Sequence, residues 1–174
     1  MKKILVISNT TFSIKKFREH YLKKISLKNQ VDVLTPGTIK DQKMFKNKYE
    51  KIRYHTFDYN SILNEFFILR KFMKKSYNLI IAYSFKYQFY IFLLNIFYNK
   101  KIINVIAGRG SLFLTENYYI KKIRDFILFF FFKYSEYTIF INKIDKSFFK
   151  KKYKITKKTF LIPTEGIELK KIKQ

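Results

Sequence analysis

Short apolar runs rich in β-branched residues alternate along this chain with segments whose apolar residues recur every three or four positions. Strands with few polar residues are typical of parallel sheets covered on both faces, and strand-helix-strand alternation implies right-handed crossovers. We therefore predict an α/β fold, a three-layer Rossmann-like domain with a mainly parallel sheet of six or seven strands. The expected strands are Lys3–Ser8, Gln30–Thr35, Ile52–Phe57, Asn78–Tyr83, Lys101–Ala107, Tyr137–Ile141 and Thr159–Ile162. The expected helices are one starting near Thr11 or Ser13, a short one before Ile52, and Ile62–Met73, Tyr87–Tyr98, Tyr118–Tyr134 and Ile144–Lys151.

The composition limits the classes of site that this domain can hold. The 174 residues suit one domain, and 48% hydrophobic residues suffice for a core. Cysteine is absent, which excludes disulfides and thiolate metal sites, and the two histidines lie far apart without neighbouring ligands. Ile4–Ile7 is too short for the apolar part of a signal peptide. We expect a cytoplasmic protein without a metal or a cofactor.

The best candidate site follows the expected strand Lys101–Ala107, where Gly108-Arg109-Gly110-Ser111 begins. Ligands of open α/β sheets bind beyond the carboxyl ends of the strands. Paired glycines expose backbone N–H groups, and arginine offers a planar, permanently charged fork, so the loop favours a phosphate or carboxylate ligand. The alternative is a plain strand-to-helix turn. The dinucleotide fingerprint is not present, because a third glycine is lacking.

Three segments in order resemble bacterial glycosyltransferase family 4. Gly108 to Phe113 is similar to the Gly-Leu-Gly-Ser-(Phe/Leu) loop of that family, Ser8 to Arg18 to its first strand-loop-helix, and Ile139 to Lys171 to its closing run with Ile-Pro-x-x-Gly-Ile-x-Leu. The resemblance implies the N-terminal, acceptor-side domain of a two-domain GT-B enzyme. Such enzymes transfer a sugar from a nucleotide sugar to a lipid-linked glycan in lipopolysaccharide, capsule or glycoprotein glycan synthesis.

The resemblance also implies a set of site residues. The implied interdomain residues are Glu165 and Gly166, and the implied substrate-binding residues are Asn9, Thr10, Arg18, Lys86, Gly108, Arg109, Gly110 and Ser111. For Arg18 the alternative is an ordinary surface arginine. The family has an apolar residue at position 109 and commonly a histidine where Phe85 stands. Histidine could act as a base near neutral pH and phenylalanine cannot, so no catalytic residue is assigned. Either acceptor activation is supplied elsewhere or this copy is impaired.

Residues 1–174 correspond to one domain of that family, and the nucleotide-sugar domain is not among them. We therefore expect no sugar transfer by this chain alone. It is either a truncated gene product or one half of a split enzyme, with the nucleotide-sugar domain lost or supplied in trans.

The charge supports a competing hypothesis. The chain has 37 Lys and Arg against 12 Asp and Glu, a net charge of +25, which attracts polyanions. The alternative function is a non-catalytic basic module that binds anionic membrane or nucleic acid. Nucleic acid is the less favoured partner, because the aromatic residues fall on expected core positions. Codon-driven enrichment in lysine is a further explanation of the charge.

Tyr118–Tyr134 contains the apolar run Phe126–Phe132, but charged residues on both sides leave it too short to span a bilayer. Burial on the sheet is the first expectation, and an interfacial helix is the alternative. A lipid-linked acceptor would place the protein on the inner face of the cell membrane. The expected membrane contacts, predicted to share one face unless their charges are scattered at random, are Lys86, Tyr87, Tyr90, Lys121, Lys122 and Arg124.

Overall fold

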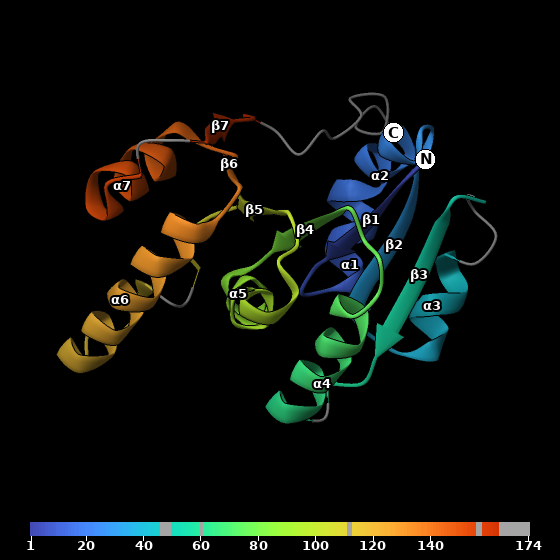
Figure 1. Ribbon diagram of the computed structural model, residues 1–174, viewed down its shortest axis with the longest axis horizontal. Helices are drawn as coiled ribbons and strands as arrows, with labels where there is room; N and C mark the ends of the chain where they lie inside the picture. The colour runs from blue at the N-terminus through green and yellow to red at the C-terminus, as the bar shows by residue number, and fades with distance from the viewer. Residues whose placement is uncertain (46–49, 60, 111–112, 156–157, 164–174) are drawn as a thin grey trace, which may run out of the picture.

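The computed structural model describes residues 1–45, 50–59, 61–110, 113–155 and 158–163. A seven-stranded sheet forms the centre of the domain, in the order β3-β2-β1-β4-β5-β6-β7 (Figure 1). Every neighbouring pair is parallel, so the predicted α/β fold with a parallel sheet is confirmed. The strands are β1 (Lys2–Ile7), β2 (Asn29–Pro36), β3 (Ile52–Phe57), β4 (Leu79–Tyr83), β5 (Ile102–Ile106), β6 (Tyr137–Phe140) and β7 (Thr159–Leu161).

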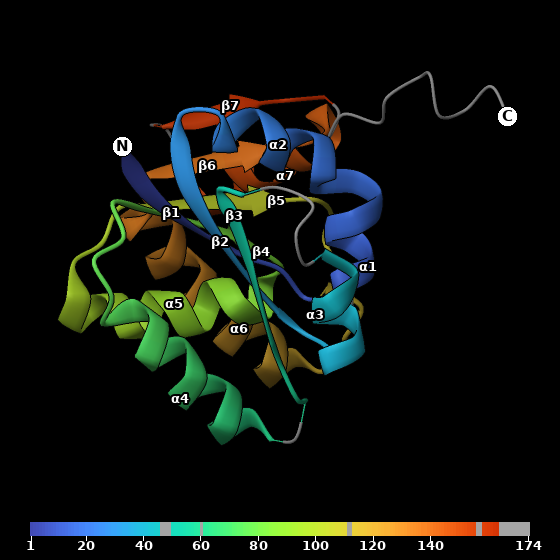
Figure 2. The same cartoon turned by 90° about the vertical axis from the view of Figure 1, so that its right-hand side faces the viewer.

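Helices cover both faces of the sheet, as its apolar strands require. α4 and α5 pack on one face against Leu5, Ile80 and Ala82, whereas η1 and α2 pack on the other against Val6 and Ile81. α4, α5 and α6 lie on one side of the sheet and α2 lies on the other (Figure 2). The helical elements are α1 (Thr11–Ser13), the π-helical segment η1 (Ile14–Arg18), α2 (Glu19–Ser26), α3 (Ile39–Phe45), α4 (Ile62–Met73), α5 (Phe85–Tyr98), α6 (Tyr118–Tyr134) and α7 (Lys143–Tyr153).

Side-chain caps explain where several helices begin. Thr10, Ser61, Asn117 and Asn142 each accept a hydrogen bond from a backbone N–H in the first turn of α1, α4, α6 and α7, respectively. Such residues satisfy donors that a helix leaves without an internal partner. The caps therefore fix the start of these helices at the positions seen.

The apolar run of α6 is only partly buried, which corrects the expectation that the sheet would bury it. Leu128, Phe131 and Phe132 join the core with α7, but Phe126 is 65% exposed and Phe129 is 44% exposed. A helix turns through a full circle every 3.6 residues, so consecutive phenylalanines cannot all face the sheet. Among the described residues, no helix is long and apolar enough to cross a membrane.

The predicted membrane contacts do not share one face. Tyr87 is 1% exposed and packs in the core beneath α4, and Arg124 is 7% exposed. Both lie on the buried stripe of their helix, where Tyr87 faces the sheet and Arg124 faces the pocket described below. This part of the prediction is wrong.

Candidate functional site

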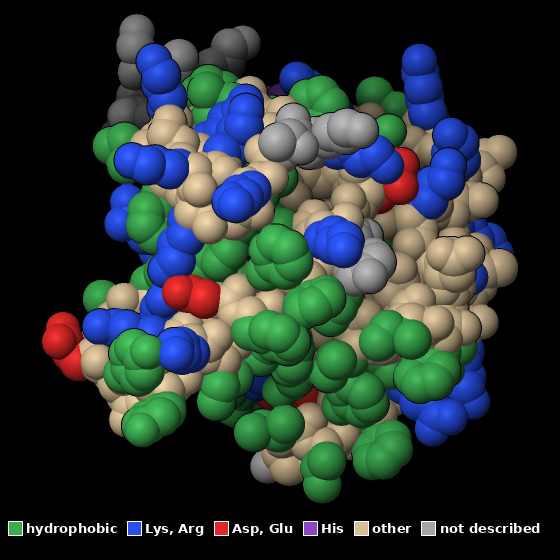
Figure 3. All heavy atoms as spheres, turned by 60° about the vertical axis from the view of Figure 1, so that its left-hand side comes forward, with side chains coloured by type: hydrophobic (Ala, Val, Ile, Leu, Met, Phe, Trp, Pro, Cys, Tyr) green, Lys and Arg blue, Asp and Glu red, His purple; other side chains and the backbone are tan. Residues whose placement is uncertain are grey.

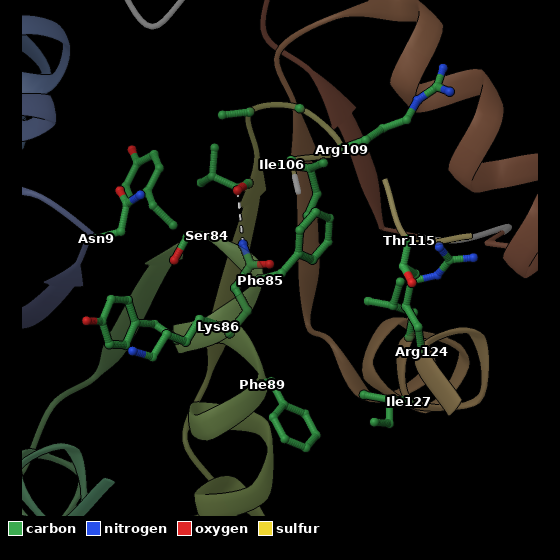
Figure 4. A pocket seen from close by; sticks show the side chains of 18 of the residues that line it. Asn9, Ser84, Phe85, Lys86, Phe89, Ile106, Arg109, Thr115, Arg124 and Ile127 are labelled. Atoms are coloured by element: carbon green, nitrogen blue, oxygen red, sulfur yellow. Dashed lines mark hydrogen bonds between the residues drawn. The ribbon is translucent and has the colours of Figure 1, made fainter. Parts of the chain in front are cut away.

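A pocket of about 1040 Å³ lies where β1, β4 and β5 end. From β1 the chain continues to its neighbour β2 in one direction along the sheet, whereas from β4 it continues to β5 in the other direction. The strand order therefore reverses between β1 and β4, at this edge. Such a point is the usual ligand site of an open α/β sheet. We call this cavity the strand-end pocket; its lining includes Asn9, Arg18, Ser84, Lys86, Gly108, Arg109, Gly110 and Arg124 (Figure 4).

The glycine loop lies in this pocket, as the sequence predicts. Gly108 has a φ of 154° and Gly110 a φ of 62°. A Cβ atom added to either residue would meet no atom within 4 Å, so the backbone conformation, and not crowding, favours glycine here. The turn brings Gly108, Arg109 and Gly110 to the pocket wall. Ser111 lies outside the described residues.

Arg109 is part of the pocket lining, and its charged group contacts α7. Its Nε donates to Asp145 Oδ1 on α7 at 3.0 Å, and its guanidinium lies 4.3 Å from the ring centre of Phe148. Figure 4 shows the side chain extending away from the other labelled residues. The predicted contact between this guanidinium and a ligand is untested and stays a prediction.

Arg18 is buried where it lines the pocket, and the alternative of a surface arginine is wrong. Arg18 is 6% exposed, and its guanidinium carbon lies 3.9 Å from the ring centre of Tyr83. Nη1 donates to Ser8 Oγ at 3.4 Å. The π-helical turn η1 ends at this residue, and such wide turns are frequent at functional sites.

Lys86 lines the pocket beside an acidic partner that the sequence did not indicate. Its Nζ lies 2.7 and 2.9 Å from the two carboxylate oxygens of Glu65 on α4 and 2.9 Å from the Tyr59 hydroxyl. Burial lowers the pKa of Lys86, but the contacts with Glu65 and Tyr59 outweigh this effect and raise it above its ordinary value. Glu65 is 1% exposed, and Lys86 is the cation that lies against its buried carboxylate.

Ser84 follows β4 at the same edge of the sheet, was not among the predicted site residues, and has an unusual backbone. It caps the start of α5 with φ 67° and ψ 139°, a conformation that costs a non-glycine residue about 1–3 kcal/mol. Its Oγ is buried and has no hydrogen-bond partner among the described residues. A serine after a strand carries no signal in the sequence that predicts such strain. Next to it, Phe85 packs against Phe113 and Phe149, each with ring centres 5.9 Å away.

Arg124 was predicted as a membrane contact and instead lines the pocket from α6. Its guanidinium carbon lies 4.4 Å from the ring centre of Phe113, and its Nη2 lies 2.8 Å from Asp125 Oδ1. One signal was present in the sequence, because position 124 falls on the same helical stripe as Ile120, Ile127 and Leu128. A charged residue on an otherwise apolar stripe indicates a buried site.

Some predicted residues are not brought into the pocket. Asn9 lines it, but Thr10 is absent from its lining and instead caps α1, its Oγ1 accepting from the Ser13 N–H at 3.0 Å. Glu165 and Gly166 lie outside the described residues. Among the described residues, no group of three His, Cys, Asp or Glu side chains is placed to hold a metal ion.

The walls of the pocket differ in chemistry. Arg18 and the glycine loop form a wall with a cationic group and backbone donors, which suits an anionic group. Phe89, Ile120, Ile127 and Leu128 form an apolar wall. Figure 4 shows Phe89 and Ile127 on the opposite side of Phe85 from the glycine loop that carries Arg109. The arrangement fits an anionic ligand that also carries an apolar part.

Comparisons with known proteins show the fold of this chain. No family model matches it, and no curated protein sequence matches it. Among solved structures, the chain is similar to sucrose-phosphate synthase from Thermosynechococcus elongatus, with a TM-score of 0.63 and 14% identity over 93% of this chain and 48% of that chain. It is also similar to HepE from Anabaena in complex with UDP-glucose, with a TM-score of 0.62 and 10% identity over 98% of this chain and 45% of that chain. A third similar structure is S. aureus MnaA with UDP, with a TM-score of 0.58 and 14% identity over 91% of this chain and 43% of that chain. The chain thus spans about half the length of these structures, and its fold is that of one half of a GT-B enzyme.

Proposed function

We propose that this domain is the acceptor-side half of a glycosyltransferase resembling family 4, and that its strand-end pocket binds a lipid-linked, diphosphate-containing glycan. The fold of a GT-B half supports a glycosyltransferase-like domain. The observation that carries the choice of ligand is the joining of cationic and apolar walls in one pocket of about 1040 Å³.

Each part of such an acceptor has a matching wall. A diphosphate carries negative charge close to Arg18 and to the backbone N–H groups of Gly108–Gly110, which are suited to anions. The first units of a polyprenyl chain are apolar and suit Phe89, Ile120 and Ile127. The glycan is the polar part that remains, and it would occupy the open side of the pocket.

Transfer also needs a nucleotide sugar. The chain aligns with about half the length of the solved structures that it resembles. We therefore propose that a second, nucleotide-sugar-binding half acts together with these 174 residues, and that these residues alone bind acceptor without transferring sugar. The biological setting that we propose is lipopolysaccharide, capsule or glycoprotein glycan assembly at the cytoplasmic face of the membrane.

The test measures binding of three small probes by isothermal titration calorimetry without detergent. Farnesyl diphosphate, which has both chemistries, should bind at least tenfold more tightly than inorganic pyrophosphate or farnesol, which have one each. Arg18→Met should weaken binding of farnesyl diphosphate by about tenfold, because charge-assisted hydrogen bonds contribute about 1.5–3 kcal/mol. Lys28→Met removes one positive charge from an exposed position outside the pocket and is the matched control.

Two results would contradict the proposal. Equal affinity for farnesyl diphosphate and pyrophosphate would mean that the apolar wall takes no part. Tight binding of UDP to these residues, with no binding of farnesyl diphosphate, would assign the pocket to a nucleotide and not to an acceptor.

A further inference from the structure

α5 is apolar on sides that do not face the core. No charged residue occurs in its sequence from Tyr87 to Asn99. Only one stripe of the helix, which includes Tyr87, Ile91 and Leu94, is buried against the sheet. On the outer side, Ile96 is 69% exposed and Phe97 is 81% exposed. A helix that is apolar all round is expected to be covered on all sides, so the outer side of α5 suits a partner.

The neighbouring helices extend this apolar surface. α6 exposes a helical stripe of Ile123, Phe126 and Phe129, and α4 exposes Phe67. α4 contacts α5 through Phe66 and Tyr90, whose ring centres are 6.0 Å apart, and α5 and α6 together line a groove of about 530 Å³. We define the α4–α6 face by the six exposed residues Phe67, Ile96, Phe97, Ile123, Phe126 and Phe129.

Figure 3 shows hydrophobic side chains gathered over the lower half of one side of the molecule, with Lys and Arg side chains above and beside them. A contiguous exposed apolar patch that extends over several helices indicates a surface that contacts another protein or a membrane. The charges on the three helices decide between these partners.

The α4–α6 face has basic residues at its edges and no exposed acidic residue on its helices. Arg70 and Lys71 on α4 and Lys122 on α6 are exposed. Among the described residues of these three helices, the acidic side chains are Glu65, which pairs with Lys86, and Asp125, which pairs with Arg124 and Lys152. The surface therefore combines apolar contact with uncompensated positive charge.

An anionic bilayer complements both properties. Aromatic and aliphatic side chains enter the boundary between head groups and acyl chains, and each basic residue near an anionic leaflet adds about fivefold in affinity. A second copy of this chain is a poorer partner, because both copies carry a net charge of +25 and would meet through basic edges.

We propose that the α4–α6 face docks on the surface of an anionic lipid bilayer. Ile120 is 49% exposed and also lines the strand-end pocket, so the apolar wall of that pocket continues onto this face. The docking surface differs from the one predicted from the sequence, because Lys86, Tyr87 and Arg124 take no part. The inference does not depend on the proposed glycosyltransferase function.

The first experiment is co-sedimentation with vesicles of 70% phosphatidylcholine and 30% phosphatidylglycerol, compared with pure phosphatidylcholine, in 0.1 M NaCl. The double variant Phe97→Ser/Phe126→Ser should bind the anionic vesicles at least tenfold more weakly than the unsubstituted chain. The matched control Phe12→Ser/Ile144→Ser removes two apolar residues of similar exposure, 64% and 73%, from other elements. Its affinity should change less than twofold.

A second pair of variants tests the charge. Lys71→Glu/Lys122→Glu and Lys28→Glu/Lys150→Glu lower the net charge equally, and all four lysines are exposed. Only the first pair should weaken binding by tenfold or more. Equal loss in both pairs would mean that net charge alone drives binding, which overturns the docking face.

Tryptophan fluorescence reports directly which residues enter the bilayer, without a comparison of affinities between variants. The chain contains no tryptophan, so Phe126→Trp introduces a single reporter on the face and Ile144→Trp introduces one away from it. Anionic vesicles should shift the emission of the first to shorter wavelength and leave the second unchanged. Equal binding to neutral vesicles, an unshifted Phe126→Trp reporter, or a dimer in sedimentation velocity that Phe97→Ser/Phe126→Ser dissociates would each overturn the proposal.

Discussion

The guanidinium of Arg18 lies over the ring of Tyr83, with 3.9 Å between its central carbon and the ring centre. Arg18 is the last residue of η1, in the helical segment that follows β1, and Tyr83 is the last residue of β4. The contact therefore joins the two strands at which the strand order of the sheet reverses. A planar guanidinium held on an aromatic ring keeps its orientation, which prepares it for an anionic ligand in the strand-end pocket.

Arg18→Lys should distinguish the contribution of the positive charge from that of the planar guanidinium stacked on Tyr83. Lysine keeps the positive charge but lacks the planar fork and stacks poorly on an aromatic ring. We expect the free energy of unfolding to fall by about 1 kcal/mol, the scale of a partly buried cation–π contact. The affinity for farnesyl diphosphate should fall about fivefold or more, measured by calorimetry on the folded variant. An affinity equal to that of the unsubstituted chain would show that charge alone is used.

Gly110→Ala tests the conformation of the glycine loop. Gly110 has a φ of 62°, and a left-handed conformation costs a residue with a Cβ about 1–2 kcal/mol. Because a Cβ would meet no atom within 4 Å, no steric clash adds to this cost. Urea unfolding should therefore show a loss of about 1 kcal/mol. A loss several times larger would mean that the loop makes closer contacts than the structure has.

The pair of Lys86 and Glu65 gives a double-mutant cycle. Lys86→Met alone leaves the carboxylate of Glu65, 1% exposed, without its cation and should destabilise the protein by about 3 kcal/mol. Adding Glu65→Leu removes the buried charge and should restore most of this loss. Denaturant titrations of the two single variants and the double variant provide the measurement. A double variant as unstable as the sum of its parts would contradict the pairing.

The same double variant tests the predicted role of Lys86 in substrate binding. The double variant is expected to regain most of its stability, so a lower affinity for farnesyl diphosphate would then indicate that Lys86 contacts the ligand. An unchanged affinity restricts Lys86 to the ion pair with Glu65.

The fold was predictable because most strands are short apolar runs that alternate with helical stripes. Ile52–Phe57, Ile62–Met73 and Tyr118–Tyr134 have the predicted bounds, and every predicted strand is present within one or two residues. The glycine loop was found for the same reason, since paired glycines follow a buried strand. Periodicity in the sequence thus predicts which elements form and, within one or two residues, where they end.

The partners of charged side chains were not predictable in this way. Glu65 lies on α4 and Lys86 on α5, and Asp145 reaches Arg109 from α7. These pairs arise only when separate elements and loops of the chain come together in the fold. Periodicity in the sequence indicates which side of a helix is apolar, but it does not indicate which charged side chains form ion pairs.

Asp32 should make stability depend on acid pH. It is buried at the centre of β2, with hydrogen bonds from Arg53 Nε at 2.7 Å and from the Tyr77 hydroxyl. Burial raises the pKa of Asp32, but the contacts with His55, Arg53 and Tyr77 outweigh it and hold the pKa well below the ordinary value of 3.8. A depressed pKa in the folded state gives stability that is present above about pH 4 and is lost as pH falls further.

Asp32→Asn removes this contribution. At pH 7 the variant should be less stable by about 2 kcal/mol, because hydrogen bonds to a charged group contribute about 1.5–3 kcal/mol. Between pH 4 and pH 2.5 the difference from the unsubstituted chain should shrink, since Asp32 then takes up a proton more readily in the unfolded state than in the folded state, and the variant has no such group at this position. Urea titrations at pH 6, 4 and 3 measure this difference, and a difference that is constant with pH would contradict the ion pair.

Phe149 should contribute more to stability than other phenylalanines of this chain that lie near the surface. It is fully buried on α7, and its ring centre lies 5.3 to 5.9 Å from those of Phe85, Phe113, Phe132, Phe140, Phe148 and Tyr153. Through these rings it supports α6 and the start of α5, which carry part of the wall of the strand-end pocket. Removing a buried aromatic ring loses its transfer free energy and leaves a cavity, at a cost of about 3–5 kcal/mol.

Phe149→Ala should therefore unfold at a clearly lower urea concentration than the unsubstituted chain and should bind farnesyl diphosphate more weakly, because α6 loses its support. Phe160→Ala is the matched control, since Phe160 is 52% exposed on β7 and should cost less than about 1 kcal/mol. If the two variants lost equal stability, the aromatic cluster around Phe149 would not be the packed core that its ring distances indicate. If Phe149→Ala lost stability but kept full affinity at a temperature where it is folded, the pocket would not depend on the position of α6.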